Sequence, residues 1–206
     1  MNESATNLPK GQLTRMAIID ASLRLATQVG LEGLSIGAVA EMMNMSKSGV
    51  FAHFGSREAL QQAVIHAYHL SFEANVFRPA MKQPRGLPRL RELMNRWLEQ
   101  LGLEIDSGCI YVSGATEFDD RPGAVRDTLI ESVNVWLLAL RRAVQQSIEM
   151  GHLHPDTNPR QMASELHGLA LALHFEGRFL RDDEAMDRAR RSVTQLLARH
   201  QITLEN

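Results

Sequence analysis

The sequence of 206 residues predicts an all-α protein of about nine helices arranged in two domains. Apolar residues recur at intervals of three and four, the period of an amphipathic helix. Runs of β-branched residues with a period of two, which are typical of strands, are missing from the sequence. Glycine, proline and serine interrupt the apolar pattern where helices would end or begin.

The first helix is expected over residues 13–29, with Gly30 as its stop and residues 1–12 as a flexible tail. Ser35 is placed to cap a short helix that ends near Met43. Asn44 tolerates the left-handed conformation that a tight turn needs. Ser46 would cap the next short helix.

The longer helices follow from apolar spacing and from breaks in the chain. The segment 81–90 holds two prolines and a glycine and is expected to be a loop. Residues 119–122 have the form of a helix cap with a proline in the first turn, and residues 158–161 resemble a capping box. The helices are expected at about 57–79, 89–103, 109–118, 119–150, 159–180 and 184–200. The chain therefore divides into a domain of residues 13–56 and a domain of residues 57–206.

Composition sets limits on location and partners. Cys109 is the only cysteine, so an internal disulfide is impossible and a reducing compartment is expected. No apolar run approaches the roughly 18 residues of a membrane span, and residues 1–12 lack the apolar stretch of a signal peptide. We expect a cytoplasmic protein with no membrane partner. The formal net charge is -2, so any nucleic-acid surface must come from local placement of charge.

The stretch from Ser35 to Leu60 carries the strongest functional signal. Two short helices joined by a tight turn form a helix-turn-helix. Ser46 would leave the second helix with an outward N-terminus, where unpaired N–H groups and partial positive charge suit a phosphate. Lys47 adds a full positive charge there. Ser48 and Gly49 are small enough for the helix to enter a major groove.

This stretch resembles the DNA-binding domain of the tetracycline-repressor (TetR) family. The resemblance covers residues 18–60 and is carried by the glycine that ends the first helix, by Ser35 and residues 38–43, and by the string SKSGVFAHFGSREAL at 46–60. It implies a dimeric transcriptional regulator, most often a repressor, with a helix-turn-helix domain and a helical domain that binds a small-molecule effector. The remainder of the chain matches the family only in size, helix count and helix order.

The resemblance also implies roles for individual residues. The N-terminus of the second short helix would face base edges and phosphates, and His53 would lie near the DNA backbone. Phe51 stands where the family often has tyrosine, so a phosphate hydrogen bond is replaced there by stacking or van der Waals contact. Ser35 and Arg57 would hold phosphates from either side. The implied DNA-binding residues are Ser35, Ser46, Lys47, Ser48, Gly49, Phe51, His53 and Arg57.

Ordinary structural roles remain open for several of these residues. Lys47 could be a solvated surface lysine, Phe51 and Phe54 could belong to the core, and His53 could cap the end of its helix. Cys109 is more often a buried apolar residue than a redox sensor. The histidines lack zinc spacing, and phosphate loops, nucleophile elbows and HExxH are missing from the sequence. We expect no metal, no cofactor and no enzymatic activity.

The family resemblance places the dimer interface on the last two long helices. Their apolar stripe includes small residues that permit close approach, although the same stripe could pack within the monomer. The candidate interface residues are Met162, Leu166, Leu169, Ala170, Leu173, Gly177, Val193, Leu196 and Leu197.

A sensor pocket is expected among the middle helices of the second domain. Such pockets are mostly apolar and hold a few polar groups. Glu117 could orient a cation or a hydroxyl, although it could also be solvated, and the aromatic residues could be core filler. The candidate pocket residues are Phe72, Val76, Met94, Trp97, Leu101, Tyr111, Glu117, Phe118, Trp136 and Leu140.

These patterns predict a repressor with three partners: a palindromic double-stranded DNA operator, a second copy of the chain and a small-molecule effector. Effector binding would favour a tilt of the helix at 57–79 that separates the two recognition helices from their half-sites. The alternative is an architectural or chromosome-organising protein of the same fold without an effector. A weaker alternative is a helical bundle that has lost its affinity for DNA.

Overall fold

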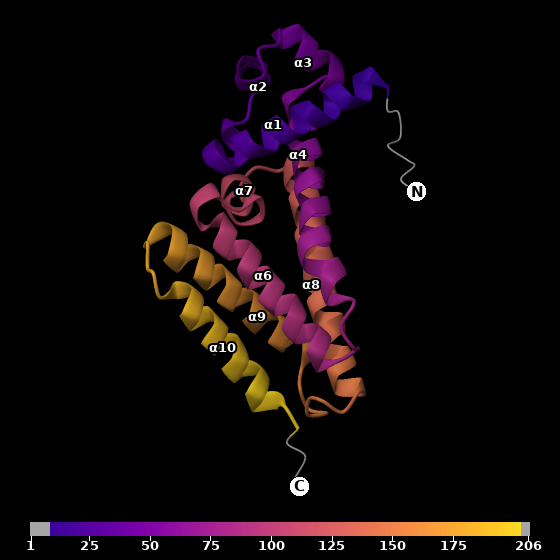
Figure 1. The fold of residues 1–206 in the computed structure, drawn as a ribbon, viewed down its shortest axis with the longest axis vertical. Helices are drawn as coiled ribbons and strands as arrows, with labels where there is room; N and C mark the ends of the chain where they lie inside the picture. Colours follow the sequence, from indigo (N-terminus) through magenta and orange to yellow (C-terminus); the bar gives the residue numbers. More distant parts are fainter. Residues whose placement is uncertain (1–8, 203–206) are drawn as a thin grey trace, which may run out of the picture.

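The computed structural model describes residues 9–202, and within that range it is an all-α protein without a strand, as predicted. Figure 1 shows the helix order. The elements are α1 (Lys10–Gly33), α2 (Ile36–Met42), α3 (Lys47–Phe54), α4 (Arg57–Phe72), the π-helical turn η1 (Glu73–Phe77), α5 (Arg78–Ala80), α6 (Leu87–Ser107), α7 (Ile110–Phe118), α8 (Ala124–Glu149), α9 (Pro159–His174), the π-helical turn η2 (Phe175–Phe179) and α10 (Ala185–His200). Because α4, η1 and α5 run on continuously, as do α9 and η2, residues 9–202 contain the nine helices that the sequence predicts.

The first helix begins earlier than expected. It starts at Lys10 and absorbs the last three residues of the predicted tail, while residues 1–8 lie outside the described range. At Gly30 the backbone leaves the helical region, with φ 78° and ψ 167°, and a last short turn leads to Gly33. The predicted stop is therefore a sharp kink within α1.

The capping residues of the small domain lie as predicted. The Ser35 hydroxyl accepts a hydrogen bond from the backbone N–H of Ala38 at 3.1 Å, and the Ser46 hydroxyl accepts one from the N–H of Gly49 at 3.1 Å. Asn44 adopts φ 53° in the turn between α2 and α3. Val50 is fully buried beneath α3, which fixes the orientation of this helix on the domain.

One predicted helix start and one predicted capping box differ in the second domain. Residues 119–122 form a turn, and α8 begins only at Ala124, because the backbone of Gly123, at φ 144°, is not helical. At the start of α9, the Asn158 carboxamide accepts from the N–H groups of Arg160 and Gln161, as a cap should. The Gln161 side chain donates instead to Glu165, so only half of the capping box forms.

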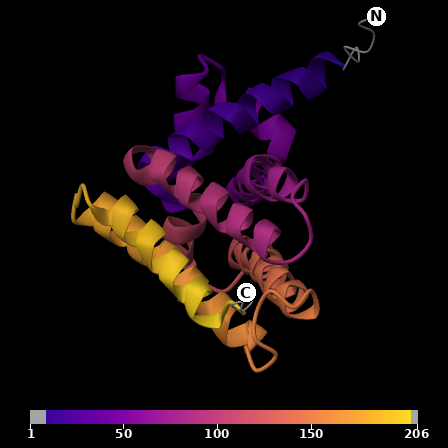
Figure 2. The ribbon, with the colours of Figure 1, turned by 60° about the horizontal axis from the view of Figure 1, so that its bottom comes forward.

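The second domain packs around α8 and α9. Figures 1 and 2 both show α10 alongside α9, and α4 descends from the small domain to lie against α8 (Figure 1). The helix-turn-helix lies at one end of the molecule, and the C-terminal end of α10 lies at the other (Figure 1). The long helix α4 is thus the main rigid connection between the two domains.

We predict that Gly30→Ala destabilises the protein by about 2–3 kcal/mol, because a side chain at positive φ is strained and the new Cβ would displace the Glu117 carboxylate. Gly151→Ala is the matched control, since Gly151 has φ 69° but open space around it. The control should cost only about 1–2 kcal/mol. Urea unfolding measures both changes, and equal losses would contradict the proposed contact with Glu117.

Candidate nucleic-acid interface and effector cavity

The exposed side of α3 forms the candidate DNA-binding surface. Lys47, Ser48 and Phe51 are exposed there, and the Phe51 side chain leaves 52% of its area in solvent. Phe51 is therefore not part of the core. Its neighbour Phe54 packs against the core, as predicted, with the Arg15 guanidinium 4.9 Å from its ring centre. His53 lies half-buried in the last turn of α3.

Lys47 lies across the first turn of α2. Gly37 has no side chain, and a Cβ built there would lie 3.1 Å from Cε and 3.5 Å from Nζ of Lys47. The lysine stem therefore fills the space above Gly37, and its ammonium lies beside the helix start that Ser35 caps. Two helix N-termini and one full positive charge thus gather on the same face, which suits a phosphate.

Arg57 differs from the prediction. Its Nε donates to the Leu34 carbonyl at 2.7 Å, and its Nη2 donates to the Glu32 carbonyl and lies 3.5 Å from the Glu32 carboxylate. The expected role as a phosphate ligand is replaced in this conformation by a contact that joins α4 to the end of α1. Sequence reasoning missed these partners because they lie more than twenty residues away.

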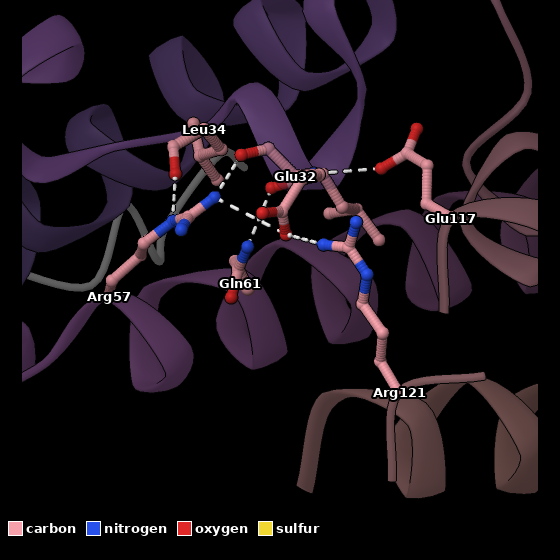
Figure 3. A network of polar contacts seen from close by, with 7 residues as sticks. Glu32, Leu34, Arg57, Gln61, Glu117 and Arg121 are labelled. Atoms are coloured by element: carbon pink, nitrogen blue, oxygen red, sulfur yellow. Dashed lines mark hydrogen bonds and ion pairs between the residues drawn. The ribbon is translucent and has the colours of Figure 1, made fainter. Parts of the chain in front are cut away.

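Glu117 also differs from the prediction, since it lies at the junction between the domains (Figure 3). Its Oε2 accepts a hydrogen bond from the backbone N–H of Glu32 at 2.7 Å. The Glu32 carboxylate lies 2.8 Å from Nη1 of Arg121, and the Gln61 amide donates to the Leu31 carbonyl at 2.6 Å. The end of α1 is therefore held by side chains from α4, from α7 and from the turn after α7.

A cavity of about 360 Å³ lies among α6, α7, α8 and α9. Four of the predicted pocket residues line it, namely Trp97, Leu101, Tyr111 and Trp136. Sequence reasoning missed its other wall residues, which come from α7, α8 and α9 and from the adjoining residue Cys109 and turn η2. These are Cys109, Val112, Ala115, Thr116, Val133, His167, Ala170, Leu171 and Phe175.

The remaining predicted pocket residues do not line this cavity. Val76, Met94 and Leu140 are completely buried in the core, so their prediction as pocket residues is wrong. Phe72 lines a smaller neighbouring cavity of about 260 Å³, whose wall also includes Trp136. Phe118 lies at a separate hollow between α7 and α8.

The aromatic residues at the cavity form one connected cluster. Trp136 contacts Trp97 and Phe72 edge-on, with ring centres 5.0 Å apart in both pairs. Tyr111 continues the cluster at 5.8 Å from Phe72. The His167 ring stacks on Trp97 at 5.6 Å, and burial lowers its pKa, so the imidazole is neutral near pH 7. The cluster links α4 to four other helices, α6, α7, α8 and α9.

Models of known protein families match both the small domain and the second domain of the chain. Residues 18–64 match the family model described as bacterial regulatory proteins, tetR family, and residues 86–193 match the model of the tetracyclin repressor-like C-terminal domain. The chain belongs to the TetR family of transcriptional regulators. The predicted family is therefore confirmed, with its DNA-binding helix-turn-helix and its helical C-terminal domain. No curated protein sequence matches the chain.

Several solved structures, a TetR-family regulator among them, share this fold. A regulator from Chloroflexus aurantiacus aligns with a TM-score of 0.85 at 18% identity, over 94% of this chain and 98% of the other. A regulator from Saccharomonospora viridis in complex with choline aligns with a TM-score of 0.79 at 18% identity, over 94% and 100% of the chains. AibR, in complex with isovaleryl coenzyme A and operator DNA, aligns with a TM-score of 0.66 at 23% identity, over 85% and 95%.

The predicted dimer stripe of this TetR-family regulator is buried within the protomer. Met162, Leu166, Ala170, Leu173 and Gly177 on α9 and η2 are all buried, and Leu169 is half-buried against the core. Val193, Leu196 and Leu197 hold α10 against the rest of the domain. The stripe is therefore core, and the expectation that these residues form the interface is wrong for the buried ones, because a single sequence does not say what covers an apolar face.

In the part of the chain from residue 9 to residue 202, we find no helix that combines the length and apolar character of a membrane span.

Cys109 is predicted to be unreactive in the native TetR-family regulator. Only 3% of the residue is exposed, and burial together with the nearby Glu104 raises the pKa of the thiol to about 12. A chromogenic disulfide reagent at mildly alkaline pH should label it only after denaturation. Because the native state holds this proton more tightly than the unfolded chain, its contribution to stability is present below about pH 9 and is lost as the pH rises towards 12. Rapid labelling of native protein would contradict this prediction.

Proposed function

We propose that this regulator is a homodimeric repressor that binds a palindromic operator through α3 and leaves it when a small molecule occupies the cavity of about 360 Å³. The observation that carries the proposal is the joint presence of an exposed recognition helix and a largely apolar cavity, linked through α4 and α7. The proposed site of action is the cytoplasm, where the operator is accessible.

The DNA-binding part of the proposal rests on α3. Ser46, Lys47, Ser48, Gly49 and Phe51 lie on or beside its first turns, and all but the half-buried Gly49 are exposed. A major groove admits one α-helix, whose N-terminal residues then reach the base edges. Ser35 and Lys47 would contact the phosphate backbone from the side of α2.

The cavity favours an effector over the architectural alternative. Its volume falls within the range of small-molecule sites, and aromatic side chains line it. A protein that only organises DNA has no need of such a space. Two structures of similar fold carry small molecules, choline in one and isovaleryl coenzyme A in the other.

The junction network provides a route from the cavity to the DNA. Tyr111 lines the cavity at the start of α7, and Glu117 holds the end of α1 from the last turn of the same helix. An effector that shifts α7 would therefore displace the contacts that orient the small domain. A population shift of this kind needs only a difference in effector affinity between the two orientations.

The solvent face of α9 and η2 supports the proposed dimer. Leu171, Phe175, Phe179 and Leu180 leave 39%, 54%, 72% and 56% of their areas in solvent. The two phenylalanine rings lie 5.2 Å apart and form a continuous apolar surface. Exposed apolar surfaces of this kind often mark protein interfaces. We propose this face in place of the buried stripe.

Lys47→Ala is predicted to weaken operator binding. If the ammonium contacts a phosphate, the slope of log K against log salt concentration should also become shallower by about one unit per subunit. If Lys47 reads a guanine, the loss should instead be about 1–3 kcal/mol and confined to one base pair. The operator is first obtained by selecting bound genomic fragments and sequencing them for a palindrome. Fluorescence anisotropy across a salt series then measures affinity.

Lys82→Ala serves as the control for this measurement, because Lys82 is an exposed lysine in the turn after α5, separated from the small domain by the continuous run of α4, η1 and α5. It removes the same charge and should leave affinity unchanged. Unaltered binding by Lys47→Ala at moderate salt would contradict the assignment of α3.

Phe179→Glu is predicted to convert the dimer to a monomer, because the substitution buries an unpaired charge in the proposed interface. Leu70→Glu is the matched control, since Leu70 on α4 is also exposed, at 59%, away from α9. Sedimentation at micromolar concentration measures both. A monomeric native protein, or a Phe179→Glu variant that remains dimeric, would refute this interface.

A further inference from the structure

Glu104 is a buried carboxylate without a cationic partner. Only 5% of the residue is exposed. The Tyr68 hydroxyl lies 2.8 and 2.9 Å from its two oxygens and shares its one proton between them, and the Gln100 amide donates to Oε1 at 2.6 Å. Within residues 9–202 no lysine, arginine or histidine forms an ion pair with it. The side chains that donate hydrogen bonds to this carboxylate are both neutral. A buried negative charge without a counter-ion is costly in free energy.

This carboxylate lies directly behind the wall of the cavity. The Tyr68 hydroxyl that binds Glu104 also lies 3.2 Å from Cys109 Sγ, and Cys109 lines the cavity. The Tyr68 ring contacts Tyr111, a second wall residue, edge-on at 4.8 Å. The carboxylate therefore lies behind a single layer of side chains, across which the attraction of its ionised form for a cation in the cavity is weakly screened.

The cavity wall itself suits a positive charge. Trp97, Tyr111, Trp136 and Phe175 contribute four aromatic rings, whose faces attract cations. None of the lining residues is a lysine or an arginine, and the lining histidine is held neutral by burial. An anionic ligand would find no counter-charge here.

We infer that the effector of this regulator is an organic cation, a quaternary or protonated amine with apolar substituents, held by the aromatic walls and countered by Glu104. The inference rests on the proposed function only in taking this cavity as the effector site. A neutral ligand would fill the space but leave the carboxylate unpaired. Burial raises the pKa of Glu104, and a cation in the cavity would favour its ionised form.

A matched pair of probes tests the inference on the full-length protein. Phenyltrimethylammonium and tert-butylbenzene have nearly the same shape and differ in charge. The chain contains two tryptophans, and both line the cavity, so their fluorescence reports occupancy. We expect the cation to bind at least about tenfold more tightly than its neutral counterpart.

Glu104→Gln tests the source of this preference. It keeps the size of the side chain but removes its charge, so the affinity for the cation should fall about tenfold while the affinity for tert-butylbenzene stays the same. Glu99→Gln on the exposed side of α6 removes the same charge and should change neither affinity. Circular dichroism checks that both variants are folded.

Equal affinities, or tighter binding of the neutral probe, would overturn the inference of a cationic effector. The proposal that the cavity is the effector site would not be affected by that result. If neither probe binds, the inference is also overturned. The operator-binding measurement uses neither probe, so DNA binding is judged separately. If Glu104→Gln does not fold, the comparison of the two probes on the unaltered protein decides the matter by itself.

Discussion

The end of α1 leaves backbone carbonyls that have no hydrogen-bond donor within the helix. The side chains that donate hydrogen bonds to these carbonyls determine how the two domains are joined. Gly30 bends the chain so that the carbonyls of residues 31, 32 and 34 face α4 rather than solvent. Gln61 and Arg57 supply the donors, and both stand on α4 (Figure 3). The small domain is therefore attached by directional hydrogen bonds, which hold one orientation more strictly than apolar contact would.

The same turn of α1 is held from the other side by α7 and by the turn that follows it. Glu117 accepts from the backbone of Glu32, and Arg121 pairs with the Glu32 side chain. Pairs that are this exposed add little to the free energy of unfolding. Their importance lies in position, because α7 is also a wall of the cavity, so a change at that wall reaches the small domain through one short helix.

Whether the sequence predicted a contact depends on how far apart along the chain its two partners lie. Ser35, Asn44 and Ser46 act on residues within a few positions of themselves, and all three lie as the sequence predicts. Glu117 acts on a backbone group 85 residues away, a distance over which a single sequence carries no information. The short helix α3 was therefore predictable in detail, while the sequence predicted only Trp97, Leu101, Tyr111 and Trp136 among the residues that line the cavity.

The α9 helix shows why periodicity alone could not separate core from interface. Its apolar residues occupy more than one face, and spacing does not say which face a partner covers. The buried face completes the protomer core, whereas Leu171 and Phe175 stand at the edge of the cavity and are still exposed to solvent. In the proposed dimer, those two side chains would be covered by the second protomer. Access to the cavity and assembly of the dimer would then depend on the same short stretch of α9 and η2, which links effector entry to the spacing of the two recognition helices.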